Sequence, residues 1–341
     1  MIDIKLLDCT LRDGGLGLED MSNYDKECHF SSEQKEFIAK LLSKSGIDII
    51  EFGAIEISEN DKKKFAIYQS IEEASHYVER LSEKYAILYR GPDTPIEKIP
   101  EWNERLIKKI RVIIRYSELK KSIEFCAALA NKGYEVFIQP MVTLRYSVDE
   151  LNYMLQAAND MNAYAMYFVD SYGCMDYDDV TRLFSLYNET LNKNIYIGFH
   201  AHNNKDMAFA NVQRFLSLAL EADRNIIVDS TCLGMGQGAG NFQTELAVSY
   251  LNEKYSKHID FNSILSVCDV IEKFNPETLW GYSIYRLLPA LYKTAYKYSV
   301  SMRLKYGMSL TEINTILKTM PDDLRQRYTL ENLNKILEKF K

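Results

Sequence analysis

Two histidines, His200 and His202, end an apolar run in the stretch Ile197-Gly198-Phe199-His200-Ala201-His202. The β-branched and aromatic residues that lead into this stretch predict a strand. Because side chains alternate between the two faces of a strand, both imidazoles are expected on the same face. Two imidazoles side by side can bind one divalent metal ion, although two ordinary polar residues at a loop edge give the same pattern. The pair therefore predicts a metal site at the end of a strand.

The elements that position this pair alternate between strand and helix along the chain. Strands are predicted at Ile4–Thr10, Ile47–Ala54, Tyr85–Tyr89, Ile110–Arg115, Glu135–Val142, Ala165–Asp170, Ile195–His202 and Asn225–Ser230. Helices are predicted at Glu33–Ser45, Ile71–Ser82, Glu118–Asn131, Val148–Asp160, Asp178–Leu191, Asp206–Ala219 and Gln243–Tyr250. Strands that are apolar throughout are typical of parallel sheets with both faces covered. The pattern predicts an α/β fold, a (β/α)₈ TIM barrel, with a doubly wound open sheet as the alternative.

The strand pattern stops near residue 257. The remaining chain is predicted to be helical, with helices at Tyr285–Ser299, Leu310–Met320 and Leu330–Phe340. We therefore expect two parts, a barrel over residues 1–257 and a small all-α C-terminal appendage over residues 258–341. The prolines between Tyr89 and Ile110 make a helix in that connection doubtful.

Composition limits the classes of function. The net charge is −7 and the chain carries no basic block, so nucleic acid is not an expected partner. No apolar run is long enough for a transmembrane helix, and no signal peptide is recognised, so no membrane association is expected. The six cysteines include no CxxC pair, which favours a reducing, cytoplasmic location. A homodimer is the default expectation for assembly.

Polar residues follow several of the predicted strands. In a (β/α)₈ barrel the carboxyl ends of the strands carry the active site. The residues expected there are Asp8, Arg12, Asp13, Glu51, Asp170, Ser171, His200, His202, Asp229 and the loop 234–241. The glycines of that loop allow the backbone to approach a ligand closely, and a phosphorylated substrate is one option. The loop lacks the GK[ST] ending of a nucleotide P-loop.

Three motifs carry a resemblance to a known superfamily. Leu7-Asp8-Cys9-Thr10-Leu11-Arg12-Asp13-Gly14 resembles the first-strand motif of the DRE-TIM metallolyases, the superfamily of HMG-CoA lyase and isopropylmalate synthase. The segments 198–204 and 229–241 look closest to the 4-hydroxy-2-oxovalerate aldolases within it. The motifs occur in the expected order, and the resemblance spans residues 4–255 with gaps in the middle.

This resemblance implies a metal-dependent lyase. By match to the motifs, Asp13, His200 and His202 would be metal ligands, and Asn241 matches a further position near the metal. An oxygen and two imidazoles suit Mn²⁺ or Mg²⁺ with open positions for a 2-oxo acid, and Zn²⁺ is also compatible. The ion would stabilise a pyruvate-type enolate as a carbon–carbon bond breaks or forms.

The resemblance also implies catalytic roles for side chains. Arg12 would stabilise the enolate oxygen, and Glu51 would orient Arg12. The general base is open, because the bacterial aldolases carry a histidine shortly after Arg-Asp-Gly where this chain has Gly15-Leu16-Gly17. Three side chains from the following loop and the tail are candidates for this base: His29, Tyr282 and Tyr285.

Other functions fit parts of the pattern. A Claisen-type acyl-CoA synthase or lyase of the same superfamily usually carries Glu-Gln after Arg-Asp-Gly, which Gly15-Leu16 speaks against. A catalytically silent metal-binding barrel acting through its helical tail is a second alternative. A two-histidine, one-carboxylate iron oxygenase is a third, but such sites usually lie on a β-jelly roll. In the bacterial aldolases the helical C-terminal region contacts an aldehyde dehydrogenase, and such a partner is possible here.

Overall fold

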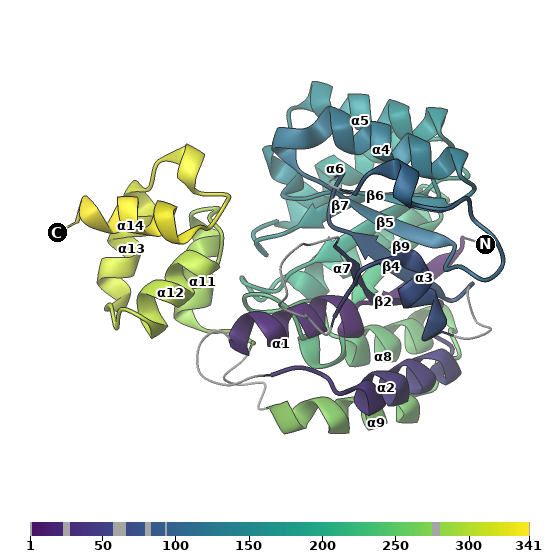
Figure 1. Cartoon of the computed structure of the whole chain (residues 1–341), viewed down its shortest axis with the longest axis horizontal. Helices are drawn as coiled ribbons and strands as arrows, with labels where there is room; N and C mark the ends of the chain where they lie inside the picture. Colours follow the sequence, from purple (N-terminus) through teal and green to yellow (C-terminus); the bar gives the residue numbers. More distant parts are fainter. Residues whose placement is uncertain are drawn as a thin grey trace.

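A closed parallel barrel forms the larger part of the computed structural model, which describes residues 2–22, 28–56, 66–78, 83–92, 94–274 and 280–340 (Figure 1). Around the barrel the strands follow the order β1 (Ile4–Asp8), β2 (Ile49–Ile55), β4 (Tyr85–Tyr89), β5 (Lys109–Ile114), β6 (Glu135–Pro140), β7 (Ala165–Asp170), β8 (Tyr196–Ala201) and β9 (Ile226–Ser230). The barrel closes because β1 pairs with both β2 and β9. The predicted (β/α)₈ fold is confirmed, and the open-sheet alternative is wrong.

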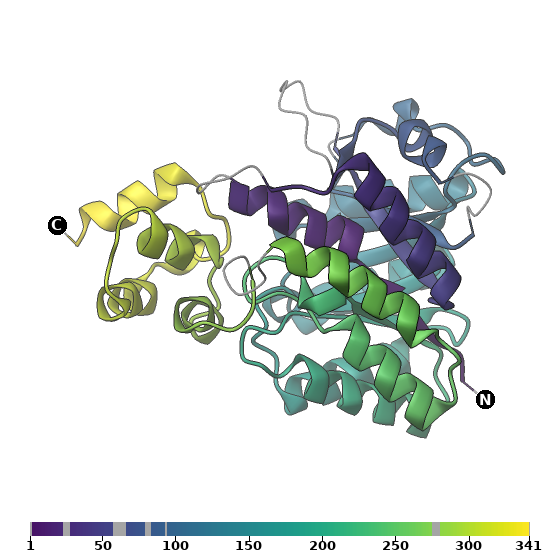
Figure 2. The ribbon, with the colours of Figure 1, turned by 90° about the horizontal axis from the view of Figure 1, so that it is seen from below.

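Helices cover the outside of this barrel (Figures 1 and 2). They are α2 (Ser32–Ser45), α3 (Ile71–His76), α4 (Leu119–Asn131), α5 (Val148–Asp160), α6 (Tyr177–Thr190), α7 (Ala208–Glu221) and α8 (Thr244–Tyr255). Ser31 and Ser147 begin α2 and α5 with reciprocal capping boxes, which fix where these helices start. Between β4 and β5 the described residues contain only a short 3₁₀ turn, Ile96–Lys98, as the prolines predicted.

Two elements before β4 were not predicted. The short strand β3 (Ile67–Tyr68) pairs with the end of β2. The helix α1 (Gly15–Ser22) begins directly after the first-strand motif, where the glycine-containing sequence was expected to form a loop. Leu18 of α1 is buried in the core, so packing rather than helix propensity accounts for this helix.

The barrel interior is packed with side chains. Leu7, Ile49, Phe137 and Tyr167 are fully buried there and form a cluster separate from the layer between strands and helices. Gly198 on β8 leaves room for the Tyr167 ring, because a Cβ atom at this position would overlap that ring. At this point the large Tyr167 ring fills the interior space that a side chain at Gly198 would otherwise occupy.

The chain after β9 and α8 divides between two groups of helices. α9 (Phe261–Ile271) packs against α2 and α8, and Ile264, Val267 and Ile271 are buried in the same core as the barrel helices. It lies beyond residue 257, where the barrel was predicted to end. The division of the chain at 257/258 stays a prediction.

The last four described helices form a group of their own at one end of the molecule (Figure 1). They are α11 (Ile284–Leu291), α12 (Lys297–Leu304), α13 (Leu310–Thr319) and α14 (Leu330–Glu338), and they share a separate apolar core. The single helix predicted over Tyr285–Ser299 is wrong, because the backbone turns at Lys293, whose φ is 51°. The predictions of helices near 310–320 and 330–340 are confirmed.

The tail is attached to loops at the carboxyl end of the barrel. Trp280 donates its Nε1 hydrogen bond to the Leu233 carbonyl at 2.8 Å, and Asn204 donates from Nδ2 to the Arg286 carbonyl at 3.0 Å. The tail therefore contacts the loops that follow β8 and β9. None of the helices in the described ranges combines the length and apolar character needed to cross a membrane.

Candidate metal centre and active site

A tight turn after β1 positions Arg12 and Asp13. Residues Thr10–Gly14 form one turn of π-helix, in which the Cys9 carbonyl accepts hydrogen bonds from the backbone N–H groups of Arg12 at 3.1 Å and Asp13 at 2.8 Å. Asp8 fixes the start of this turn by accepting from the Thr10 N–H at 2.9 Å. The buried Asp8 carboxylate therefore holds the turn through a hydrogen bond.

Asp13, His200 and His202 meet at the mouth of the barrel. One ligand atom from each of these three residues lies within 4.8 Å of the other two. The Nε2 atoms of the histidines are 3.3 Å apart, and His202 Nε2 is 3.9 Å from Asp13 Oδ2. Because nitrogen–metal bonds are about 2.1 Å long, two nitrogen atoms at this separation can contact the same ion. The three residues that the sequence named as ligands are thus brought together.

The protonation states at this site suit a cation. His200 Nδ1 lies 2.8 Å from Asp229 Oδ2, so the imidazole donates there and leaves the Nε2 lone pair for a ligand bond. Burial lowers the pKa of His202 to about 4, which keeps its ring neutral at pH 7. Burial raises the pKa of Asp13, but the charge of Arg12 outweighs it, and the net pKa is about 2. The ionised Asp13 carboxylate and the neutral His202 imidazole therefore face each other.

Asn241 also belongs to this group of side chains. Its Nδ2 atom donates to Asp13 Oδ2 at 2.5 Å and to the Met235 carbonyl at 2.8 Å. Its amide oxygen is buried and has no hydrogen-bond partner among the described residues, so one oxygen donor is unused. Gly236 has φ +148°, and a Cβ atom there would lie 2.7 Å from Asp13 Oδ2. The glycine loop thus lies directly against the site, as its composition predicted.

A chain of buried ion pairs connects the residues of the metal centre to the barrel interior. Arg12 Nε lies 2.6 Å from Glu51 Oε2, and Arg111 Nη1 lies 2.8 Å from the same oxygen. Arg111 also pairs with Asp229, which holds His200. With Asp13 included, three carboxylates and two guanidinium groups give these five groups a net charge of −1 when the imidazoles are neutral. A net negative charge in a buried site is compensated by a bound cation. The residues present therefore fit a divalent ion.

A cavity of about 160 Å³ opens onto these groups. Arg12, Asp13, His200 and His202 line it, together with the polar side chains of Gln139, Ser171 and Gln237 and the apolar side chains of Leu16, Leu88 and Val169. Leu16 lies in the segment where the bacterial aldolases were expected to carry a histidine. The described lining therefore forms a small polar chamber with an apolar wall.

The three candidates for the general base lie elsewhere in the described structure. His29 is half-buried in the segment just before α2. Tyr282 is 62% exposed, and the Tyr285 ring packs against the Arg286 guanidinium at 5.3 Å. None of them is among the described residues that line the cavity. Their role as base stays a prediction.

Arg111 is the main functional side chain that sequence reasoning missed. It lies in the middle of β5, is fully buried, and connects Glu51 to Asp229. A charged residue between the apolar residues Ile110 and Val112 of a strand was the available signal. Asp229 was placed at a strand end, but its contact with His200 could not be read from spacing.

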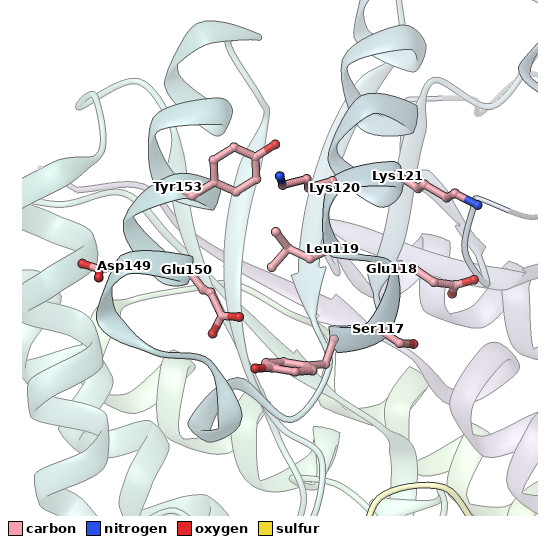
Figure 3. Close-up of a pocket in the computed structure, with 9 residues that line it drawn as sticks. Ser117, Glu118, Leu119, Lys120, Lys121, Asp149, Glu150 and Tyr153 are labelled. Carbon is pink, nitrogen blue, oxygen red and sulfur yellow. The ribbon is translucent and has the colours of Figure 1, made fainter. Parts of the chain in front are cut away.

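A second depression lies between the beginnings of α4 and α5 (Figure 3). It measures about 550 Å³, and Leu119, Lys120 and Tyr153 face it. Its charged lining mixes two lysines with three acids, Glu118, Asp149 and Glu150. None of these acids belongs to a group of described residues that could hold a metal ion.

Comparison with known proteins agrees with the fold. The model of the HMGL-like family matches residues 3–271. This chain belongs to the HMGL-like family. The matched range runs from β1 to the end of α9 and includes every residue of the metal centre described above.

HMGL-like relatives show the same relationship in more detail. A 4-hydroxy-2-oxovalerate aldolase from Pelotomaculum thermopropionicum is 27% identical over 318 residues, which cover 91% of this chain and 89% of that protein. The N-terminal domain of a proposed aldolase from Bacteroides vulgatus is 25% identical, with a TM-score of 0.72 and coverage of 91% of this chain and 98% of that one.

An HMG-CoA lyase from Brucella melitensis shares the fold, with a TM-score of 0.61 at 16% identity over 80% of this chain and 99% of that one. The family and the curated relatives identify this chain as a lyase that acts on carbon–carbon bonds.

Proposed function

We propose that this HMGL-like chain is a divalent-metal-dependent aldolase that cleaves or forms a carbon–carbon bond through the pyruvate-type enolate of a 2-oxo acid. The observation that carries the proposal is the meeting of Asp13, His200 and His202 with the Arg12 guanidinium in one small cavity. The similarity to 4-hydroxy-2-oxovalerate aldolases supports the same reaction class.

Asp13, His200 and His202 would hold the ion, with the Asn241 amide oxygen as a further donor. Mn²⁺ and Mg²⁺ fit this mixture of oxygen and imidazole ligands, and Zn²⁺ is compatible with it. When bound, such an ion supplies a Lewis acid that stabilises the enolate of a coordinated 2-oxo acid.

Arg12 is the side chain best placed to bind the enolate oxygen. Its Nε atom is fixed by Glu51 at 2.6 Å and one Nη atom by Asp13 at 2.6 Å. Its other Nη group has no acceptor among the described residues, and the side chain lines the cavity. A cation held rigidly beside developing negative charge stabilises the transition state more than the bound substrate.

Glu51 is proposed as the residue that orients Arg12. It is fully buried and accepts from Arg12 and Arg111 through the same oxygen. The residue that removes the proton from the C4 hydroxyl is proposed to be His29, Tyr282 or Tyr285, as the sequence suggested. A homodimer and an aldehyde dehydrogenase partner also remain proposals.

The test of this function is a screen of the Mn²⁺-loaded chain against a panel of 4-hydroxy-2-oxo acids, with pyruvate release as the readout. We expect release from at least one acid, and loss of both metal and activity in His200→Ala. His258→Ala is the matched control, because His258 is an exposed histidine outside the centre.

Absence of pyruvate release from every acid, in protein that holds one ion per chain, would refute the proposal. That result would favour the silent metal-binding barrel. Full metal content in His200→Ala would instead refute the ligand assignment.

A further inference from the structure

A second cavity opens beside the metal centre, between the barrel and the helical tail. We call it the arginine pocket, after the four arginines that line it: Arg90, Arg115, Arg145 and Arg327. Its volume is about 640 Å³. Two acidic side chains, Glu56 and Glu118, also line it, so its described charged groups sum to +2 in a chain whose net charge is −7. This local excess of positive charge favours an anionic ligand.

The arginine pocket is continuous with the metal centre. Arg90, Ile113 and Met141 line both cavities. Strand register explains this, because Tyr89 pairs with Val112 and Ile114 pairs with Pro140, so the three shared residues lie near the carboxyl ends of adjacent strands β4, β5 and β6. A substrate whose 2-oxo acid half lies at the metal centre can therefore extend its other half into the arginine pocket.

Two of the four guanidinium groups are already paired. Arg90 contacts Glu56 at 2.8 Å, and Arg115 contacts Glu118 at 3.1 Å. The other two, Arg145 and Arg327, have no carboxylate within ion-pair distance in the described part of the chain.

Arg145 is positioned by its surroundings. It follows β6 in the turn Thr143–Arg145, and its guanidinium lies 4.0 Å from the centre of the Tyr116 ring. Stacking on an aromatic ring restricts the guanidinium while leaving its N–H groups available to an acceptor.

Arg327 is brought to the pocket by the tail. The hydroxyl oxygen of the buried Tyr298 lies 2.7 Å from the Leu324 carbonyl and 2.9 Å from the Arg327 carbonyl, and its single proton is shared between these two acceptors. The Tyr172 hydroxyl of the barrel lies 3.4 Å from the Gln326 carbonyl. The segment that carries Arg327 is therefore fastened to both the tail and the barrel, and the tail completes the wall of the pocket.

We propose that the arginine pocket binds a carboxylate or phosphate group on the aldehyde half of the substrate, so that this aldolase selects acceptors with an anionic tail. The proposal rests on the proposed function for the role of its ligand as an acceptor, but anion binding can be tested without turnover. The depression of Figure 3 is a poor alternative site, because acids outnumber lysines in its lining.

The first test measures binding. Inorganic phosphate and succinate are titrated separately into the Mn²⁺-loaded full chain by calorimetry, with the double variant Arg145→Gln/Arg327→Gln and the control Arg105→Gln. Replacing Arg145 and Arg327 leaves no described carboxylate without its ion-pair partner. The control residue Arg105 is an exposed arginine before β5, at the opposite end of the barrel.

We expect saturable binding of at least one anion, weakened at least fivefold in the double variant and unchanged in Arg105→Gln. The anion that binds tells a phosphate site from a carboxylate site. Equal affinity in all three proteins, or no saturable binding of either anion, would overturn the proposal.

The second test measures selectivity in condensation with pyruvate. Succinic semialdehyde and glyceraldehyde 3-phosphate are compared with the neutral aldehydes butanal and glyceraldehyde. In the double variant the ratio of kcat/KM for anionic over neutral acceptors should fall about tenfold or more, as expected for lost charge-assisted hydrogen bonds.

Condensation with a ratio that the double variant leaves unchanged would overturn the acceptor role while the proposed aldolase function stands. No condensation with any aldehyde, combined with arginine-dependent anion binding, would refute the proposed function and uphold the anion site.

Discussion

Replacing Arg111 by methionine tests whether the ion-pair chain beneath the metal centre is held together as the structure indicates. Methionine keeps much of the apolar length of the side chain but removes the charge. Arg111 is fully buried between Glu51 and Asp229. The change therefore leaves two buried carboxylates without one of their cations.

The size of the decrease in stability depends on which partners each carboxylate retains in Arg111→Met. Glu51 retains Arg12 at 2.6 Å, so its charge stays paired. Asp229 retains no cation among these partners, but keeps the Tyr167 hydroxyl at 3.0 Å, the His200 imidazole at 2.8 Å and the weakly donating Cys9 thiol at 3.7 Å. One buried charge thus loses its guanidinium, and breaking a buried pair in this way costs about 3–5 kcal/mol. We expect that decrease in the free energy of unfolding at pH 7 in urea denaturation of the metal-free chain.

The loss of unfolding free energy caused by Arg111→Met should be smaller at lower pH. Burial alone raises the pKa of Asp229, but the charge of Arg111 outweighs burial and holds that pKa below its ordinary value. In the parent chain this depressed pKa stabilises the fold above the unfolded-state value near 4, and the contribution is lost as pH falls. Without Arg111, burial dominates, the folded-state pKa rises, and protonation of Asp229 relieves the unpaired charge. The cost of Arg111→Met should therefore shrink from pH 7 towards pH 5, by at most about 1.4 kcal/mol per pH unit.

Arg224→Met is the matched control for this experiment. Arg224 is also fully buried, but it donates to the Asn188 side chain and to backbone carbonyls, including those of Leu191 and Asn192. Its replacement should be costly with little dependence on pH. A cost for Arg111→Met that is constant between pH 5 and pH 8 would show that no carboxylate is left charged, and would refute the reasoning.

Three further outcomes are expected. Arg12→Lys should keep the metal but lower kcat about 10²–10³-fold, because lysine lacks the planar fork; a rate within about threefold of the parent would contradict this role. Asp229→Asn should weaken Mn²⁺ binding about 10–100-fold in equilibrium dialysis, because His200 loses its orienting carboxylate. Gly236→Ala should also weaken Mn²⁺ binding, since its Cβ would press on Asp13, whereas Gly307→Ala, with open space around it, should leave binding unchanged.

Much of the fold could be predicted from the local pattern. The bounds of β4, β7 and α5 match their predictions, because each is a continuous apolar strand or an amphipathic helix with a strong cap. The failures have physical causes that lie outside the local sequence. α1 is helical because Leu18 packs into the core, and the helix predicted over Tyr285–Ser299 breaks where Lys293 adopts a positive φ.

The candidate site could be predicted where ligands follow strand ends. Parallel strands bring Asp13 and the histidine pair to the same edge of the barrel. Strand period predicted the histidine pair, whereas Asp13 was chosen as a ligand by its match to the first-strand motif. Contacts that cross the barrel interior were not accessible in this way. Arg111 and Asp229 are 118 positions apart, and nothing in either strand specifies their pairing.

The arginine pocket could not be predicted from the sequence pattern. Arg90 and Arg145 follow strands β4 and β6, whereas Arg327 arrives from the tail. Its contribution depends on the docking of a helical group whose contact with the barrel includes the hydrogen bond from Tyr172 to the Gln326 carbonyl.

The most direct test of the central claim is a titration of the metal-free chain with Mn²⁺ in which bound metal and pyruvate release are measured in the same samples. The proposed centre predicts that both rise together and saturate at one ion per chain, and that Asp13→Asn, His200→Ala and His202→Ala shift both curves in parallel. Pyruvate release at the full rate from the metal-free chain, before any Mn²⁺ is added, would contradict this account. Pyruvate release that is unchanged in these three variants would also contradict it.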